Sequence, residues 1–319
     1  MKALYFDSRG LKLVKRPMPT IDEDEAMIKV NLAGICATDI EIIKGYMDFS
    51  GIPGHEFVGE VVSAKSKEWV GKRVVGEINI YCNNCETCRA GLKKHCPNRK
   101  VLGIYKKDGV FAEYLTLPVI NLHEIPEKLS DEEAIFVEPL AAACEFIDRV
   151  PIKQSSRIAI IGDGKLAALI AQVLLNSTRR IIVLGHSDKR LRFFKEMGLD
   201  VKNTRKSKRM PEKEFDIVIE SSGSPEGLPE AVKLTKPRGT VILKSTYNGN
   251  LNWNPAQVVI DEITIIGSRC GPFDKAINLL SSGKVSTKKL LTTTFPLEEW
   301  EKAFDMATRD DVFKIALKP

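Results

Sequence analysis

The sequence predicts an α/β protein with two domains, one rich in β-strands and one built on a doubly wound parallel sheet. Three observations lead to this prediction. The chain has 319 residues, more than a single hydrophobic core usually supports. Its first third alternates short β-rich runs with glycine, proline and asparagine. After Pro151, apolar strands alternate with amphipathic helices, which is typical of a parallel sheet covered by helices.

The β-rich part extends from Ala26 to about Leu117. We expect its clearest strands at Ala26–Asn31, Phe57–Ser63 and Arg73–Ile80. Strand-like alternation begins already at Met1, where no basic segment, long apolar run or cleavage site for export is visible.

The second part alternates strands and helices in a regular order. The expected elements are strand Arg157–Ile161, helix Lys165–Asn176, strand Ile181–Leu184, helix Lys189–Met197, strand Asp216–Ile219, helix Pro229–Leu234, and strands Thr240–Leu243 and Ile263–Gly267. Two further helices, Phe273–Ser281 and Leu297–Ala307, precede a last strand at Phe313–Leu317.

Composition excludes several classes of function. A hydrophobic fraction of 43% with 28% charged residues is ordinary for a globular protein, and no apolar run approaches the roughly 20 residues that span a bilayer. The net charge of +6 is spread among 42 acidic residues, so we expect neither a nucleic acid nor a membrane as partner. Seven cysteines, several of them clustered, suit metal binding in a reducing compartment, and we expect a cytoplasmic protein.

A glycine-rich turn follows the strand Arg157–Ile161 and opens a helix. The segment Gly162–Ala167 reads G-x-G-x-x-A, the fingerprint of dinucleotide-binding sheets in its required strand–turn–helix setting. Gly162 permits the tight turn, and Gly164 lets backbone amides approach a pyrophosphate at the helix N-terminus. The alternative is a glycine turn that binds nothing. The expected cofactor contacts here are Gly162, Gly164, Lys165 and Leu166.

The residues after the next strand bear on the choice of cofactor. Where an acid would hold the ribose hydroxyls of NAD, the chain has Gly185, followed by His186, Ser187, Asp188 and Lys189. A hydroxyl and a cation near a missing acid favour NADP over NAD, with Gly185, His186, Ser187 and Lys189 as contacts. Asp188 keeps NAD open, because a one-residue shift of the turn would bring it to the ribose. Lys189 and its neighbour could also form a solvated helix face.

Four cysteines form the strongest single motif of the chain. Cys82, Cys85, Cys88 and Cys96 have the spacing C-x2-C-x2-C-x7-C, which lets one loop wrap four thiolates around a tetrahedral zinc ion. With four protein ligands the site is closed, so we expect a structural role.

A second group of potential metal ligands is dispersed along the chain. It comprises Cys36, His55, Glu56 and Glu138. Thiolate, imidazole and carboxylate together suit a zinc ion with an exchangeable position. Taken singly, each residue has an ordinary structural explanation: a small core cysteine, a turn, or an acid in the first turn of a helix.

Together these motifs resemble the zinc-dependent branch of the medium-chain dehydrogenase/reductase superfamily, which includes alcohol, sorbitol, glucose and threonine dehydrogenases. The resemblance covers nearly the whole chain. Its most specific parts are G-H-E-x-x-G at Gly54–Gly59, the four-cysteine loop, E-P-L-A at Glu138–Ala141 and the glycine fingerprint, all in the family's order.

The resemblance implies a GroES-like catalytic domain, residues 1–150 and 270–319, interrupted by a Rossmann domain, residues 151–269, with the active site in the cleft between them. Cys36 and His55 match the family's catalytic zinc ligands. Glu56 and Glu138 match carboxylates that coordinate directly or alternate with water in the polyol branch. In the alcohol branch a cysteine ligand occupies the position of Ala142, so the match favours a polyol-type site.

The resemblance also assigns roles around the metal. Thr38 matches the hydroxyl that takes the proton of the alcohol, and Asp39 matches a carboxylate that supports His55, although it could also cap a helix. Glu41 stands where many relatives have a histidine that relays the proton, and is either that relay or an exposed helical residue. Lys314 falls where relatives often have a cation near the cofactor phosphates.

The expected activity is hydride exchange between NAD(P) and a primary or secondary alcohol, a polyol or a sugar. Zinc would lower the pKa of the substrate hydroxyl and leave an alkoxide that expels hydride to the nicotinamide. We expect two zinc ions per chain, and a homodimer or homotetramer joined near Ile263–Gly267. The alternatives are a zinc-independent quinone or enone reductase and a non-catalytic member of the same superfamily.

Overall fold

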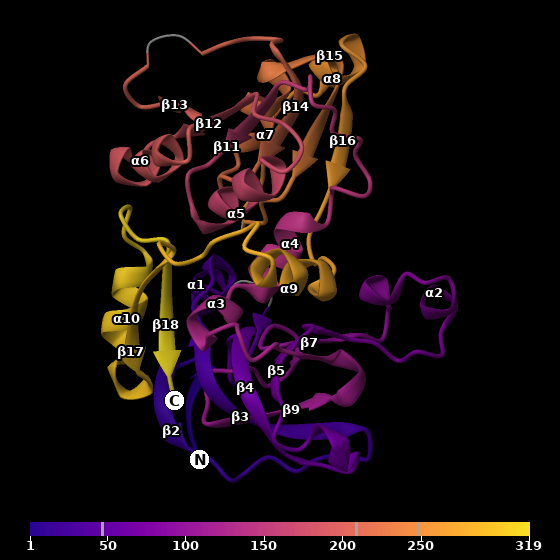
Figure 1. Ribbon diagram of the computed structural model, residues 1–319, viewed down its shortest axis with the longest axis vertical. Helices are drawn as coiled ribbons and strands as arrows, with labels where there is room; N and C mark the ends of the chain where they lie inside the picture. The colour runs from indigo at the N-terminus through magenta and orange to yellow at the C-terminus, as the bar shows by residue number, and fades with distance from the viewer. Residues whose placement is uncertain (46–47, 208–209, 248) are drawn as a thin grey trace. The chain divides into compact units, whose positions relative to one another are not determined.

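The computed structural model describes residues 1–45, 48–207, 210–247 and 249–319. Contacts between residues divide the chain into two compact units (Figure 1). The first unit comprises Met1–Glu138, Phe273–Arg309 and Lys314–Pro319, and the second comprises Pro139–Pro272 and Asp310–Phe313.

The first unit is built on a seven-stranded sheet. Its strands follow the order β10-β5-β4-β3-β18-β17, and β9 also pairs with β3. Their bounds are β3 Glu25–Gly34, β4 Glu56–Ala64, β5 Arg73–Gly76, β9 Tyr114–Pro118, β10 Leu122–Glu124, β17 Leu291–Pro296 and β18 Lys314–Lys318. Two small sheets accompany it, formed by β1 Lys2–Asp7 with β2 Gly10–Lys15, and by β6 Asn79–Ile80, β7 Lys100–Leu102 and β8 Lys106–Lys107.

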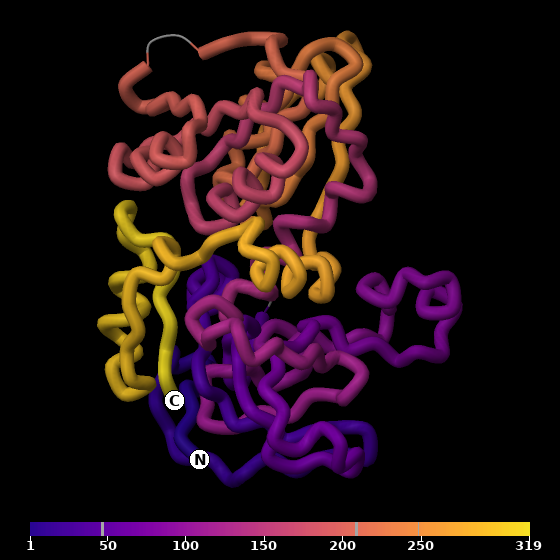
Figure 2. Tube along the Cα trace, in the orientation of Figure 1, coloured from indigo at the N-terminus to yellow at the C-terminus, as the bar shows by residue number. Residues whose placement is uncertain are grey.

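The last strand of the chain completes this first sheet. Strand β18 runs antiparallel to β3, with Ala316 opposite Gly34, and parallel to β17. In Figure 2 the yellow C-terminal trace therefore joins the unit that holds the indigo N-terminus. The helices of this unit are α1 Ala37–Ile43, α2 Glu86–Arg89, α3 Asp131–Ala134, α9 Phe273–Ser281 and α10 Trp300–Ala307.

The second unit is built on a six-stranded parallel sheet in the order β13-β12-β11-β14-β15-β16. Its strands are β11 Ile158–Ile161, β12 Ile181–Gly185, β13 Asp200–Asn203, β14 Phe215–Glu220, β15 Thr235–Leu243 and β16 Thr264–Gly267, and its helices are α5 Lys165–Leu174, α6 Asp188–Glu196, α7 Gly227–Leu234 and α8 Ala256–Ile260. Helix α4, Val137–Cys144, contains the point in the sequence where the first unit gives way to the second. Strand order reverses between β11 and β14, and ligands of such sheets bind at the carboxyl ends of the strands beside this reversal.

The predicted α/β fold is confirmed, and several elements differ in detail. The run Arg73–Ile80 is divided into β5 and β6, because Glu77 and Ile78 leave the sheet. Strand β13 was not predicted. The segment Leu297–Ala307 opens with a 3-10 turn at Leu297–Glu299 before α10 begins.

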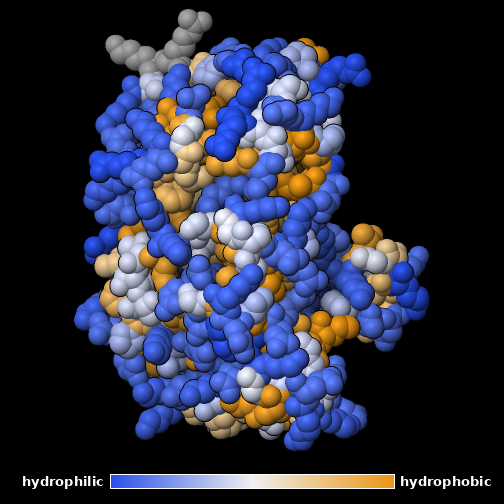
Figure 3. All heavy atoms as spheres, in the orientation of Figure 1, coloured by the Kyte–Doolittle hydropathy of each residue, from blue (hydrophilic) through white to orange (hydrophobic). Residues whose placement is uncertain are grey.

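The surface is mostly hydrophilic on the face drawn in Figure 3, where hydrophobic atoms emerge in the area of β15 and β16. Beside β16, Val259 and Ile260 are 77% and 71% exposed, and Ile265 within the strand is 38% exposed. Within the described ranges, no helix combines the length and the apolar character needed to cross a bilayer.

Candidate active site

Three of the predicted metal ligands converge in the first unit. One ligand atom each of Cys36, His55 and Glu56 lies within 4.8 Å of the others. Cys36 is the N-cap of α1 and Glu56 opens β4, while His55 and Glu56 are buried. A thiolate, an imidazole and a carboxylate at this spacing form a donor set that fits a zinc ion.

Asp39 connects two of these ligands. One carboxylate oxygen lies 3.1 Å from His55 Nδ1, and the other accepts the backbone N–H of Cys36 at 2.7 Å. Asp39 therefore occupies the third position of a capping box, and Cys36 itself is the N-cap. If the Nδ1 hydrogen points to Asp39, the other ring nitrogen keeps its lone pair for a metal.

The electrostatic environment of these ligands favours a cation. Burial lowers the pKa of His55, but Asp39 and Cys36 outweigh burial and hold that pKa well above its usual value. Negative groups thus dominate around the ring, and a metal ion at the same place would supply the positive charge that they favour.

Lys314 adds a cation to the same cluster. Its ammonium group is buried, forms an ion pair with Glu56 and donates a hydrogen bond to the carbonyl oxygen of Ile35 at 3.1 Å. Burial lowers the pKa of Lys314 to about 8, against the attraction of Cys36 and Asp39. The structure thus places the Lys314 ammonium group at the candidate metal site.

The other residues expected around this site lie as follows. The Thr38 hydroxyl is 3.9 Å from Cys36 Sγ. Glu41 lies on α1, where one of its oxygens accepts a hydrogen bond from Lys44 at 2.9 Å. Glu138 is half-buried in α4 and lies outside the group of three ligands that the described residues bring together.

The four cysteines of the predicted structural site also come together. Their sulfur atoms all lie within 4.8 Å of one another, with Cys96 and Cys82 at 3.5 Å and Cys85 and Cys96 at 3.8 Å. The backbone amide of Asn84 contributes most to lowering the pKa of Cys82 to about 6, so this sulfur is readily available as a thiolate. The donor set and its spacing fit a closed zinc site.

The glycine fingerprint has the predicted geometry at the carboxyl end of β11. Gly162 has a φ of 112°, and a Cβ there would lie 2.6 Å from the carbonyl oxygen of Ser221. Gly164 is the N-cap of α5, Lys165 and Leu166 form its first turn, and no atom lies within 4 Å of an added Cβ at Gly164. Both glycines therefore suit a backbone that a dinucleotide approaches closely.

The expected ribose-binding residues lie between β12 and α6. The Ser187 hydroxyl donates to the carbonyl oxygen of Asp310 at 2.6 Å, and Lys189 pairs with Asp311 at 2.9 Å. His186 Nε2 is 3.5 Å from a carboxylate oxygen of Asp310. Segment 310–313, which the sequence did not connect with this turn, therefore contacts three of its four expected cofactor residues.

The role of Asp163 in this region was not predicted from the sequence. This residue lies between the two glycines of the fingerprint, and its side chain is buried below the β12–α6 turn. The only sign in the sequence was an acid inside a glycine-rich turn.

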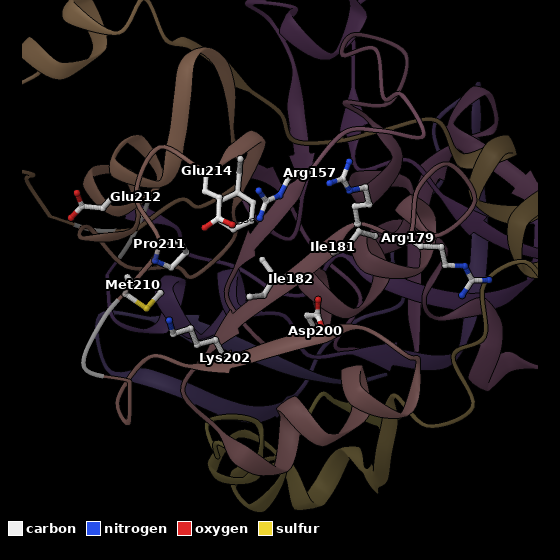
Figure 4. Close-up of a pocket in the computed structure, with 12 residues that line it drawn as sticks. Arg157, Arg179, Ile181, Ile182, Asp200, Lys202, Met210, Pro211, Glu212 and Glu214 are labelled. Atoms are coloured by element: carbon white, nitrogen blue, oxygen red, sulfur yellow. Dashed lines mark hydrogen bonds and ion pairs between the residues drawn. The ribbon is translucent and has the colours of Figure 1, made fainter.

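A separate open cavity of about 1180 Å³ lies at the other end of the same sheet (Figure 4). Its lining includes Arg157, Arg180 and Phe215, which lie next to or within the first residues of β11, β12 and β14. Arg157 and Glu214, both part of this lining, form an ion pair. Because dinucleotides bind at the carboxyl ends of parallel strands, this cavity is not the cofactor site.

Family models match both parts of the chain. Residues 22–127 match the alcohol dehydrogenase GroES-like domain, and residues 162–282 match a zinc-binding dehydrogenase domain. D-arabinitol dehydrogenase 1 of Uromyces fabae is 30% identical, with 100% of this chain and 97% of that protein covered. A sorbitol dehydrogenase of Halalkalibacterium halodurans is 28% identical, with 100% and 99% covered.

Solved structures agree over the same length. A putative zinc-binding dehydrogenase from Sinorhizobium meliloti, bound to NADP, has a TM-score of 0.90 at 27% identity. An Escherichia coli protein described as a short chain alcohol dehydrogenase, in complex with NADH, has a TM-score of 0.91 at 27% identity. Each alignment covers 100% of this chain and 99% of the other.

Proposed function

The chain belongs to the zinc-dependent medium-chain dehydrogenase family, and from this premise we propose which of its residues carry out the reaction. It is an oxidoreductase that transfers a hydride between NAD(P) and an alcohol or polyol. The zinc-independent reductases of the superfamily are therefore excluded as a model for this chain.

We assign two zinc ions to each chain. Cys36 and His55 hold the catalytic ion, and Glu138 and Glu56 are the carboxylates that complete its coordination or give way to water. Cys82, Cys85, Cys88 and Cys96 hold the structural ion. Support comes from the two groups of ligand atoms, each within 4.8 Å. When bound, the catalytic zinc acts as a Lewis acid toward the substrate oxygen, and the nicotinamide takes the hydride.

Protein side chains handle the proton and hold the ligands. The Thr38 hydroxyl, 3.9 Å from Cys36 Sγ, is positioned to accept the proton of the substrate alcohol. Asp39 fixes the ring of His55 through Nδ1. Glu41 is the candidate that passes the proton to solvent, a role that requires its contact with Lys44 to open.

Lys314 has a different proposed role from the one expected from sequence. Its buried ammonium group contacts Glu56. We therefore propose that Lys314 acts on the Glu56 carboxylate and does not bind the cofactor phosphates. The ion pair with Lys314 competes with the metal ion for the Glu56 carboxylate. Lys314 therefore opposes permanent coordination by Glu56 and favours an exchangeable position for substrate.

The cofactor is a nicotinamide dinucleotide, and we place its pyrophosphate on Gly162, Gly164, Lys165 and Leu166. The adenosine ribose then reaches the turn from Gly185 to Ser187. From the sequence, Ser187 and Lys189 predicted a preference for NADP over NAD. In the structure both residues already contact segment 310–313, so a 2′-phosphate would have to replace these contacts.

For the substrate we propose a polyol or a related small hydroxylated compound. Two of the similar proteins are dehydrogenases of arabinitol and sorbitol, and Ala142 lacks the thiol that an alcohol-branch zinc ligand would supply.

We propose two functional domains, a catalytic domain of residues 1–150 and 270–319 and a cofactor-binding domain of residues 151–269. A cytoplasmic location fits seven cysteines of which none forms a disulfide.

The observation that carries the proposal is the convergence of Cys36, at the start of α1, with the adjacent residues His55 and Glu56, at the start of β4. Elemental analysis of protein purified without chelator should give two zinc ions per chain. The variant Cys36→Ala should keep one ion and lose turnover of a polyol panel. Cys270→Ala, a cysteine outside both ligand groups, serves as the matched control and should keep both ions.

Two outcomes would contradict this assignment. Full zinc content and turnover in Cys36→Ala would remove Cys36 from the catalytic site. Tight binding of cofactor without turnover of any alcohol or carbonyl, in protein holding both ions, would support a non-catalytic member of the family.

A further inference from the structure

A carboxylate from the fingerprint loop supports the turn that follows β12. Asp163 is 1% exposed, and one of its oxygens accepts the backbone N–H groups of both His186 and Ser187, each at 2.8 Å. Two charge-assisted hydrogen bonds, both accepted by one buried oxygen, fix the conformation of this turn.

Gly185 and Asp163 form a matched pair. A Cβ at Gly185 would lie 2.4 Å from Asp163 Oδ2, closer than real Cβ atoms approach such a neighbour. The Asp163 carboxylate therefore occupies the space that a side chain at the end of β12 would fill. In dinucleotide-binding sheets, that strand end ordinarily supplies the acid that recognises the ribose hydroxyls. Here the acid is present, but it comes from the fingerprint loop.

This arrangement removes the donors that a 2′-phosphate would use. The amides of His186 and Ser187 lie at the N-terminus of α6, Asp188–Glu196, where an anion would be bound favourably. Asp163 already accepts from both amides and adds negative charge beneath the turn. A phosphate on the ribose would find both amides already engaged by a buried carboxylate.

The cations of the turn are also engaged with carboxylates or carbonyls. Arg190 Nη1 lies 3.6 Å from Asp163 Oδ1, and the same side chain donates to the carbonyl oxygen of Val312 at 2.8 Å. Lys189 pairs with Asp311 at 2.9 Å. These contacts neutralise the positive charges of Arg190 and Lys189, which would otherwise attract a phosphate.

We propose that Asp163 is the specificity-determining residue for the cofactor and favours the unmodified ribose of NAD over the 2′-phosphate of NADP. The proposal rests on the proposed function, because it requires the adenosine ribose to lie on the β12–α6 turn. It reverses the preference that Ser187 and Lys189 suggested in the sequence.

The test compares equilibrium binding of NADH and NADPH to the full-length zinc-loaded protein by fluorescence titration. Wild type should bind NADH more tightly. Asp163→Asn should shift the ratio of the two dissociation constants toward NADPH by at least about tenfold, a change equivalent to about 1.4 kcal/mol. Asp200→Asn, which removes an exposed acid at the first residue of β13, is the matched control and should leave the ratio within about twofold, on the same scale.

A second variant keeps the proposal testable if Asp163→Asn does not fold. In the double variant Asp163→Ala with Gly185→Asp, the carboxylate moves to the strand end, into space that the first substitution vacates. This variant should restore the preference for NADH relative to Asp163→Ala alone.

The outcomes separate this proposal from the assigned function. A wild-type protein that prefers NADPH, or an unchanged ratio in folded Asp163→Asn, overturns the role of Asp163 while the dehydrogenase assignment stands. Failure of wild type to bind either dinucleotide overturns the placement of the cofactor and, with it, this proposal.

Discussion

Asp39 serves the local fold and the metal site with one side chain. One of its oxygens closes the first turn of α1 through the Cys36 amide, and the other holds His55. Because both contacts lead to candidate zinc ligands, the geometry of the site depends on a residue that does not itself bind the metal.

Replacing Asp39 should weaken the catalytic zinc and spare the structural one. We expect Asp39→Asn to lower the affinity for one of the two ions by about 10- to 100-fold, the usual cost of losing a hydrogen-bond partner of a ligand. Competition with a chromophoric chelator measures this affinity. Asp200→Asn, in the second unit, is the control, and equal affinities in the two variants would refute the role of Asp39.

Gly34 is confined by the ion pair of Glu56 and Lys314. A Cβ at this position would lie 2.7 Å from a carboxylate oxygen of Glu56 and 3.0 Å from Lys314 Nζ. Gly34→Ala should therefore lower the free energy of unfolding by about 1–3 kcal/mol through overpacking. Urea unfolding of the metal-free protein measures this change.

The control for this substitution is Gly164→Ala, because open space surrounds an added Cβ at Gly164. A change below about 1 kcal/mol is expected there. If Gly34→Ala were as stable as wild type, the ion pair of Glu56 and Lys314 would be able to move aside with no loss in the free energy of unfolding.

At the scale of elements, His123 connects β10 with α9, two elements far apart in sequence. Its ring nitrogens lie 2.9 Å from a carboxylate oxygen of Asp274 and 3.2 Å from one of Glu77, and the ring stacks on Phe273. Burial lowers the pKa of His123, but the two carboxylates outweigh it and raise the pKa above its usual value.

This raised pKa gives a pH-dependent contribution to stability with a defined sign. A histidine whose pKa is higher in the folded state stabilises fully below its unfolded value of about 6.5, and the contribution is lost as the pH rises through the folded value. His123→Gln should thus be less stable than wild type at pH 6, with a smaller difference at pH 9. Urea unfolding at pH 6 and pH 9 measures the difference in free energy of unfolding between wild type and variant. The same difference at both pH values would show that His123 contributes only through packing.

The sequence predicted elements well where the signal is local. The glycine turn and the apolar helix after it identified β11 and α5, and the helix Phe273–Ser281 was predicted with its observed bounds. Strand β13 has a single apolar residue, Val201, and is a strand because it pairs with β12. No local pattern encodes that pairing.

The same distinction applies to the candidate site. The four cysteines lie close together in the sequence, so their spacing alone predicted a common metal. The contact of Lys314 with Glu56 and the support of the β12–α6 turn by Asp163 depend on the tertiary fold. Family resemblance placed Lys314 near the cofactor, and the structure shows its ammonium group beside Glu56.

At the scale of the whole molecule, the exposed edge of the parallel sheet suggests how copies of the chain associate. Strand β16 ends the sheet, and Val259, Ile260 and Ile265 expose apolar side chains on or beside it. An unpaired apolar edge is a favourable surface for pairing with a second copy. We therefore propose a homodimer or homotetramer joined through β16.

Charge on this edge should dissociate the assembly. The double variant Val259→Glu with Ile260→Glu should have the mass of a monomer by multi-angle light scattering, because association would bury two carboxylates without partners. Val70→Glu, at a residue 43% exposed in the first unit, should keep the wild-type mass. A monomeric wild-type protein would refute the proposed interface.

The late position of β18 in the chain has a consequence for biosynthesis. Lys314 is translated 279 residues after Ile35, the carbonyl that it contacts, and β18 supplies a strand of the sheet that contains β3. On the ribosome, Glu56 therefore spends most of the elongation time without its ammonium partner. The four cysteines of the proposed structural site are made within the first third of the chain, whereas the proposed catalytic cluster lacks Lys314 until β18 has been made.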